Sequence, residues 1–252
     1  MAEAAIALTG IRKRYGDRVA VDGIDLVVPA GTFFGLLGPN GAGKTTTLSI
    51  ATGLLRPDEG VARIHGVDVW REPLVAKRMI GVLADAEDLF ERLTVEQLLT
   101  YSGLLFGLPR ATVTERTAEL IDLLDLGATA GIAVSDCSAG TTKKAALACA
   151  LIHSPRLLVL DEPFESVDPV SAANIRDILS GFVAAGGTAV VSSHSMDLVE
   201  RMCDHVAIVA DGRLLASGPL DEVRAGRTLE DRFLELVGGR RAGQGPEWLR
   251  PF

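Results

Sequence analysis

Gly38-Pro39-Asn40-Gly41-Ala42-Gly43-Lys44-Thr45-Thr46 is the stretch that decides how this chain of 252 residues folds. The apolar run at 32–37 has the length of a buried strand, and residues 47–52 can continue as a helix. A strand, a glycine loop and a helix in this order are typical of a phosphate-binding loop, because glycines let backbone N–H groups and the helix N-terminus approach an anion. The alternative is a glycine-rich turn without a ligand, but the flanking elements favour phosphate binding.

The residues of this loop have separate expected roles. We expect Lys44 to reach the β- and γ-phosphates of a nucleotide, and the hydroxyl of Thr45 to be a ligand of Mg²⁺. The other loop residues that we expect to contact the nucleotide are Gly38, Asn40, Gly41, Gly43 and Thr46.

Composition excludes several classes of protein. The 25 basic residues are outnumbered by 33 acidic ones, which argues against nucleic acid as a partner. Three cysteines, without the spacing of a metal site, predict reduced thiols in the cytoplasm. The N-terminus lacks the pattern of a signal peptide, and no apolar run approaches the ~18 residues of a membrane span. We therefore expect a chain that is soluble or peripheral on a membrane.

Hydrophobic periodicity predicts an α/β fold, and the glycine loop within it indicates a P-loop NTPase core. Short strands between 5 and 28, with a turn at Gly16-Asp17, predict a small antiparallel β subdomain. Between about 94 and 126 the period becomes helical, with capping boxes expected at Thr94/Gln97 and Thr112/Glu115. We therefore expect an α-helical subdomain, inserted at about 86–155, in a domain that spans 1–237. A mobile tail at 238–252 is expected to follow.

The acidic end of a second apolar strand points to hydrolysis. Residues 157–160 form this run, and Asp161 and Glu162 follow it directly. Asp161 is placed to hold Mg²⁺ through water, and Glu162 to polarise an attacking water. The alternative is an acidic strand end that faces solvent.

Two further side chains are candidates for the same site. His194 ends another apolar strand, where it could sense the γ-phosphate or could be a satisfied core histidine. Tyr15 precedes a turn, where its ring could stack on a base or could simply be half-buried.

Together these motifs make the chain resemble the nucleotide-binding subunit of an ATP-binding cassette (ABC) transporter, over residues 5 to about 237. The resemblance implies that Glu162 is the catalytic base, His194 the switch histidine and Tyr15 the aromatic residue that stacks on adenine. Residues 228–236 are similar to subunits that serve separate, exporter-type membrane proteins. The matching motifs are the Walker A motif at 38–46, the Walker B motif at 157–162 and the D-loop at 166–168.

The chain departs from the family pattern at two places. The signature L-S-G-G-Q is replaced by Cys137-Ser138-Ala139-Gly140-Thr141, which keeps the serine and the second glycine. Ser138 and Gly140 at a helix N-terminus can grip the γ-phosphate held by a second subunit. Asp85 stands where the family has the glutamine of the Q-loop, and we expect it to contribute to the metal site.

The resemblance implies an ATPase that powers transport by a separate integral membrane subunit. A second ABC ATPase, identical or different, is the other expected partner, and the expected location is the cytoplasmic face of the cell membrane. The main alternative is a soluble ABC ATPase that acts in cofactor assembly or in another role outside transport.

Overall fold

The computed structural model describes residues 3–83 and 89–238. Its central sheet has six strands in the order β10-β9-β3-β8-β7-β6. These strands are β3 (Phe33–Leu37), β6 (Ile80–Leu83), β7 (Leu157–Leu160), β8 (Thr188–Ser193), β9 (His205–Ala210) and β10 (Arg213–Pro219). All neighbours pair in parallel except β9 and β10, which form an antiparallel hairpin that turns at Asp211-Gly212.

A second sheet of four strands is antiparallel and has the order β2-β1-β4-β5. It contains β1 (Ala4–Tyr15), β2 (Arg18–Pro29), β4 (Glu59–Ile64) and β5 (Val67–Asp68). The expected short strands are instead two strands of 12 residues that turn at Gly16-Asp17. Gly10 and Gly23 do not end these strands, because their positive φ angles of 59° and 73° let the chain shift register and continue pairing.

Two hydrophobic clusters cover the two faces of the central sheet. In β3 the alternation of side chains sends Phe33 and Leu37 into one cluster, and Phe34 and Leu36 into the other. The second cluster lies between the sheet, the antiparallel strands and α1 (Lys44–Ala51). Both faces of the sheet are therefore buried, as in a layered α/β protein, and the predicted fold class is confirmed.

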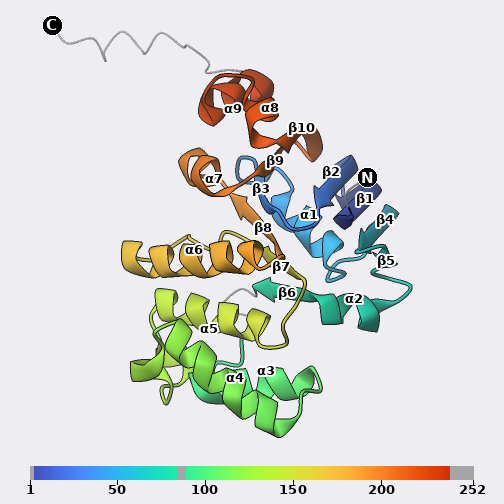
Figure 1. Ribbon diagram of the computed structural model, residues 1–252. Coiled ribbons are helices and arrows are strands. Elements are labelled where there is room, and N and C mark those ends of the chain that lie inside the picture. The colour runs from blue at the N-terminus through green and yellow to red at the C-terminus, as the bar shows by residue number, and fades with distance from the viewer. Residues whose placement is uncertain (1–2, 84–88, 239–252) are drawn as a thin grey trace, which may run out of the picture.

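Most of the remaining helices extend along and beyond the sheet face that the first cluster covers (Figure 1), whereas the helix at Pro73–Met79 buries Ala76 in the second cluster. Figure 1 shows α3 (Val95–Leu105) and α4 (Arg110–Leu123) at the end of the molecule opposite α9 (Leu229–Val237). The helices are α2 (Pro73–Met79), α3 (Val95–Leu105), α4 (Arg110–Leu123), α5 (Ala139–Leu151), α6 (Pro169–Ala184), α7 (Met196–Met202), α8 (Leu220–Arg224) and α9 (Leu229–Val237). Within the part of the chain that the structure describes, no helix combines the length and the apolar character needed to cross a bilayer.

One of the two expected capping boxes is present. Thr94 accepts a hydrogen bond from the backbone of Gln97, whose side chain in turn accepts one from the backbone N–H of Thr94. The box predicted at Thr112 is wrong, because α4 already begins at Arg110, after Pro109. Thr112 therefore lies inside the first turn, where its backbone is helical and cannot have the extended conformation of a cap.

Candidate nucleotide-binding site

The glycine loop connects β3 to α1 and is held tightly between neighbouring strands. Gly43 is the residue before α1 and has a left-handed φ of 100°. A side chain on Gly43 would place its Cβ 2.4 Å from the carbonyl oxygen of Ala20 in β2. A Cβ on Gly38 would lie 2.3 Å from the carbonyl oxygen of Val209 in β9. Packing thus requires glycine at both positions, and at Gly43 the left-handed backbone requires it as well.

Lys44 lies inside the loop and is buried, with 6% of its surface exposed. Its ammonium nitrogen donates a hydrogen bond of 2.8 Å to the carbonyl oxygen of Gly38 and a longer one of 3.4 Å to that of Pro39. The same nitrogen lies 3.5 Å from Oε1 of Glu162. The charge is therefore fixed at the centre of the loop, where it can meet an anion.

The order of the strands brings the acidic residues to this loop. Strand β8 pairs with β3 on one side and with β7 on the other, so the C-terminal ends of all three strands lie at one edge of the sheet. Asp161 and Glu162 follow β7, and His194 follows β8. Nδ1 of His194 lies 3.1 Å from Oε2 of Glu162, whose other oxygen faces Lys44. The three predicted side chains Lys44, Glu162 and His194 therefore meet.

A cavity of about 450 Å³ lies over the loop, a size suited to a small ligand. Tyr15 is half exposed at its edge, with the ammonium of Lys13 5.8 Å from the centre of the ring. The residues around the cavity are Tyr15, Arg18, Ala20, Pro39, Asn40, Gly41, Gly43, Lys44, Thr45, Thr46 and Glu162. Seven of the predicted residues, Tyr15, Asn40, Gly41, Gly43, Lys44, Thr45 and Thr46, thus surround one cavity together with the predicted base.

Arg18 is a member of this cavity that the sequence motifs do not identify. It pairs with Tyr15 across the turn between β1 and β2, and its guanidinium donates a hydrogen bond of 3.4 Å to the carbonyl oxygen of Gly41. Arg18 and Lys44 are the cations among the residues around the cavity. In the sequence, Arg18 is marked only by its short distance from Tyr15. That distance indicates a site residue only when the hairpin is known to lie beside the glycine loop.

The side chains at the predicted metal site fit Mg²⁺ in their chemistry. Thr45 offers a hydroxyl at the cavity, and Asp161 a carboxylate whose Oδ1 accepts a hydrogen bond from Ser192. Mg²⁺ prefers oxygen ligands and commonly takes only one or two from protein, with water and phosphate supplying the others. Residues 3–83 and 89–238 contain no cluster of three or more histidine, cysteine or acidic side chains that could hold a metal ion. Asp85, the other predicted ligand, lies outside the described residues.

Ser138 and Gly140 do not join the cavity of their own chain. Ser138 is exposed and caps α5, where its hydroxyl accepts a hydrogen bond of 3.2 Å from the backbone of Thr141. A Cβ on Gly140 would meet Oδ2 of Asp168 at 3.5 Å, so this glycine lies beside the segment that resembles the D-loop. Neither Ser138 nor Gly140 is among the residues around the cavity of its own chain.

Comparisons with known proteins agree with this site. The family model described as ABC transporter matches residues 21–165, which is more than half of the chain. The chain is 38% identical over 244 residues to the daunorubicin resistance ATP-binding protein DrrA3 of Streptomyces coeruleorubidus, covering 97% of this chain and 76% of that protein. It is 37% identical over 220 residues to the Nod factor export ATP-binding protein I of Cupriavidus metallidurans, covering 87% and 73% of the two chains.

A solved ATP-binding subunit of an ABC transporter superposes with a TM-score of 0.86 at 28% identity, covering 92% of this chain and 99% of that one. Sequence and fold thus lead to the same family. The chain belongs to the ABC transporter family, and it is an ATP-binding subunit with the ATPase fold of that family.

Proposed function

We propose that the chain binds ATP with Mg²⁺ in the cavity over the glycine loop and hydrolyses it to drive export by a separate membrane-spanning subunit. The ring of Tyr15 stacks on the base, and Lys44 binds the β- and γ-phosphates. Thr45 and Asp161 hold Mg²⁺, which would neutralise phosphate charge as the bond to the γ-phosphate breaks. Glu162 polarises the attacking water, and His194 senses the γ-phosphate.

One observation carries this proposal: the carboxylate of Glu162 lies between Lys44 and His194. Its two oxygens are 3.5 Å from the Lys44 ammonium and 3.1 Å from the His194 ring nitrogen. A base beside the phosphate-binding cation is placed to orient water toward the γ-phosphate. Arg18 lies between Tyr15 and the loop, so we assign it to the α-phosphate, the part of ATP that joins the base and ribose to the phosphates bound by Lys44.

A second ATPase subunit completes the site. Ser138 and Gly140 lie at the N-terminus of a helix of 13 residues and do not border their own cavity. The free N–H groups and the dipole at such a terminus attract anions. We infer that they bind the γ-phosphate held by a second cassette, identical or different, so that ATP is enclosed between two chains.

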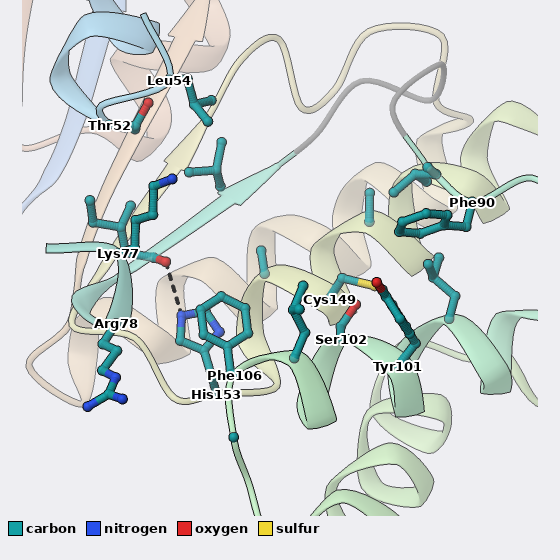
Figure 2. Close-up of a pocket in the computed structure, with 18 of the residues that line it drawn as sticks. Thr52, Leu54, Lys77, Arg78, Phe90, Tyr101, Ser102, Phe106, Cys149 and His153 are labelled. Atoms are coloured by element: carbon teal, nitrogen blue, oxygen red, sulfur yellow. Dashed lines mark hydrogen bonds between the residues drawn. The ribbon is translucent and has the colours of Figure 1, made fainter. Parts of the chain in front are cut away.

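A groove beside the helical region is the proposed contact with the membrane partner. It has a volume of about 600 Å³ and lies between α2, β6, α3 and α5. Figure 2 shows Phe90, Tyr101 and Phe106 around it, with Lys77 and Arg78 on α2 at its other side. Leu74 and Leu105 border the groove and remain 77% and 70% exposed, which is typical of an interaction surface. Its apolar walls and two cations suit an amphipathic segment with an acidic end.

The segment between the central sheet and the groove contains Asp85. The segment that contains Asp85 connects β6 to Leu89 and Phe90, which border the groove. We propose that Asp85 links the nucleotide to the partner, that residues 1–237 form the ATPase unit, and that about 86–155 form its helical subdomain.

The relatives named for drug resistance and for Nod factor export favour export. A peripheral position on the cytoplasmic face of the membrane follows from binding both cytoplasmic ATP and a membrane subunit.

The test measures assembly and ATP turnover with the membrane subunit in lipid vesicles. Leu105→Glu should abolish co-purification with that subunit while binding of ATP to the chain is unchanged. Val27→Glu is the matched control, because Val27 is 60% exposed on β2 and does not border the groove. Equal assembly of both variants would exclude the groove. Capture of a soluble assembly factor without any membrane protein would instead favour the alternative outside transport.

A further inference from the structure

Ser192 connects the two acidic residues of the site through one hydroxyl group. It lies on β8 and is completely buried. Its Oγ donates a hydrogen bond to Oδ1 of Asp161 and accepts one of 2.9 Å from the backbone N–H of Glu162. The hydroxyl thus donates its single proton to Asp161 and accepts a hydrogen bond from Glu162 with a lone pair.

The backbone at Glu162 explains what the second hydrogen bond does. Glu162 has a φ of 44°, in the left-handed region that a residue with a Cβ adopts only at a cost of about 1–3 kcal/mol. Surrounding contacts must hold this conformation, and the bond to Ser192 anchors the peptide directly before the Glu162 Cα. Lys143 adds a hydrogen bond of 2.6 Å to the carbonyl oxygen on the other side. The side chain of Glu162 is thus directed between Lys44 and His194.

We propose that Ser192 is a positioning residue that sets the orientation of both carboxylates, and thereby couples the metal ligand to the catalytic base. This inference rests on the proposed function. The bond to Oδ1 fixes the rotation of the Asp161 carboxylate and leaves Oδ2 for Mg²⁺ or its water. Hydrogen-bond partners that orient a metal ligand commonly change metal affinity or activity by about 10- to 100-fold.

Another buried hydroxyl on the same strand provides a matched control. Thr188 is 1% exposed, and its Oγ1 accepts a hydrogen bond of 2.9 Å from the backbone N–H of Gly31. It lies at the opposite end of β8 from Ser192. Thr188→Ala therefore removes a buried hydroxyl and leaves a backbone N–H unpaired, as Ser192→Ala does, but touches neither acidic residue.

The first measurement uses Mn²⁺ as the probe and needs no turnover. Electron paramagnetic resonance gives the affinity of Mn²⁺ for the purified chain with bound ADP. We expect Ser192→Ala to weaken Mn²⁺ binding about 10-fold, and Thr188→Ala to leave it unchanged. Ser192→Thr, which keeps the hydroxyl, should restore most of the affinity. Equal Mn²⁺ affinity in Ser192→Ala and Thr188→Ala would overturn the proposal.

A double-mutant cycle tests whether Ser192 acts through Asp161. In a chain that carries Asp161→Asn, adding Ser192→Ala should cause little further loss of Mn²⁺ affinity, because the carboxylate that it orients is gone. Full additivity of the two losses would contradict the coupling.

Turnover gives the second readout. In Ser192→Ala we expect kcat to fall at least 10-fold at saturating metal, with KM for ATP within about twofold of the wild type, because the base is misdirected while the loop is intact. A wild-type chain that binds Mn²⁺ and ADP but never hydrolyses ATP, even with its partner, would refute the proposed function. The Mn²⁺ measurements would still decide the role of Ser192.

Discussion

The ammonium nitrogen of Lys44 lies 3.5 Å from a carboxylate oxygen of Glu162, although the two residues come from opposite halves of the ATPase domain. The carboxylate is 20% exposed and the lysine side chain 7%, so water screens this pair only partly. A bound phosphate would compete with Glu162 for the Lys44 ammonium. Nucleotide binding would therefore release the carboxylate of Glu162 from this contact.

Glu162→Gln should separate binding from hydrolysis. We expect kcat to fall about 10²- to 10⁴-fold, the usual contribution of a general base. ATP affinity should stay equal or increase, because the substitution removes a negative charge beside Lys44. The ATP-bound dimer should then accumulate, as measured by light scattering with ATP and Mg²⁺. Lys44→Ala is the control, since it should abolish nucleotide binding itself; normal turnover in either variant would contradict the assigned roles.

Tyr15→Ala should weaken nucleotide binding through the loss of stacking. Stacking of a base on an aromatic ring contributes about 1–3 kcal/mol, so the Kd for ATP should rise about 5- to 150-fold. Tyr15→Phe keeps the ring and should bind ATP as the wild type does. Isothermal titration of ATP into the three chains makes the comparison. Wild-type affinity for ATP in Tyr15→Ala would mean that the half-exposed ring does not stack on the base.

Arg18→Gln tests the cation that borders the cavity beside Gly41. The side chain is exposed, so its contact with phosphate should contribute only about 1 kcal/mol, which is about a fivefold rise in KM for ATP with kcat unchanged. The affinity for ADP should fall by the same factor, whereas that for adenosine should not. Arg14→Gln is the matched control, because Arg14 is exposed on β1 and does not border the cavity. An equal loss for adenosine would show that Arg18 only holds the hairpin in place.

His153 should make stability depend on pH. Burial lowers the pKa of His153 from its usual value of 6.5, while its Nε2 lies 3.0 Å from the carbonyl oxygen of Ile80 and its ring stacks on Phe106. The unfolded chain therefore binds a proton at mildly acidic pH that the folded chain does not. The free energy of unfolding should thus be greatest above the usual pKa and decrease below it, by at most about 1.4 kcal/mol per pH unit.

Denaturant titrations of the wild type and His153→Gln between pH 5 and pH 8 measure this effect. The variant should be less stable at pH 8 but should lose less free energy on acidification. Parallel pH profiles for the two chains would show that His153 does not cause the dependence.

The glycine loop and the acidic strand end were predictable from the sequence because their geometry is local. Gly41 and Gly43 adopt positive φ angles of 79° and 100° that only glycine reaches without strain, and the strand and helix are their direct neighbours in the chain. An apolar run likewise specifies a buried strand whatever it pairs with. Fold class, Lys44 and the pair Asp161 and Glu162 could therefore be identified before any tertiary contact was known.

Only the tertiary structure decides which of these local elements meet. Strand β8 lies between β3 and β7 because it forms backbone hydrogen bonds with both, although β3 lies more than 100 residues earlier in the chain, and no local pattern specifies that order. This pairing brings the ring of His194 into contact with the carboxylate of Glu162, and it brings the hydroxyl of Ser192 within hydrogen-bonding distance of Asp161. The β1–β2 hairpin packs beside the glycine loop and brings Arg18 to the cavity, whereas Ser138 at the start of α5 does not border it. The physical reason is that a motif fixes the conformation of its own backbone, whereas the site depends on distances between motifs that only the packed sheet determines.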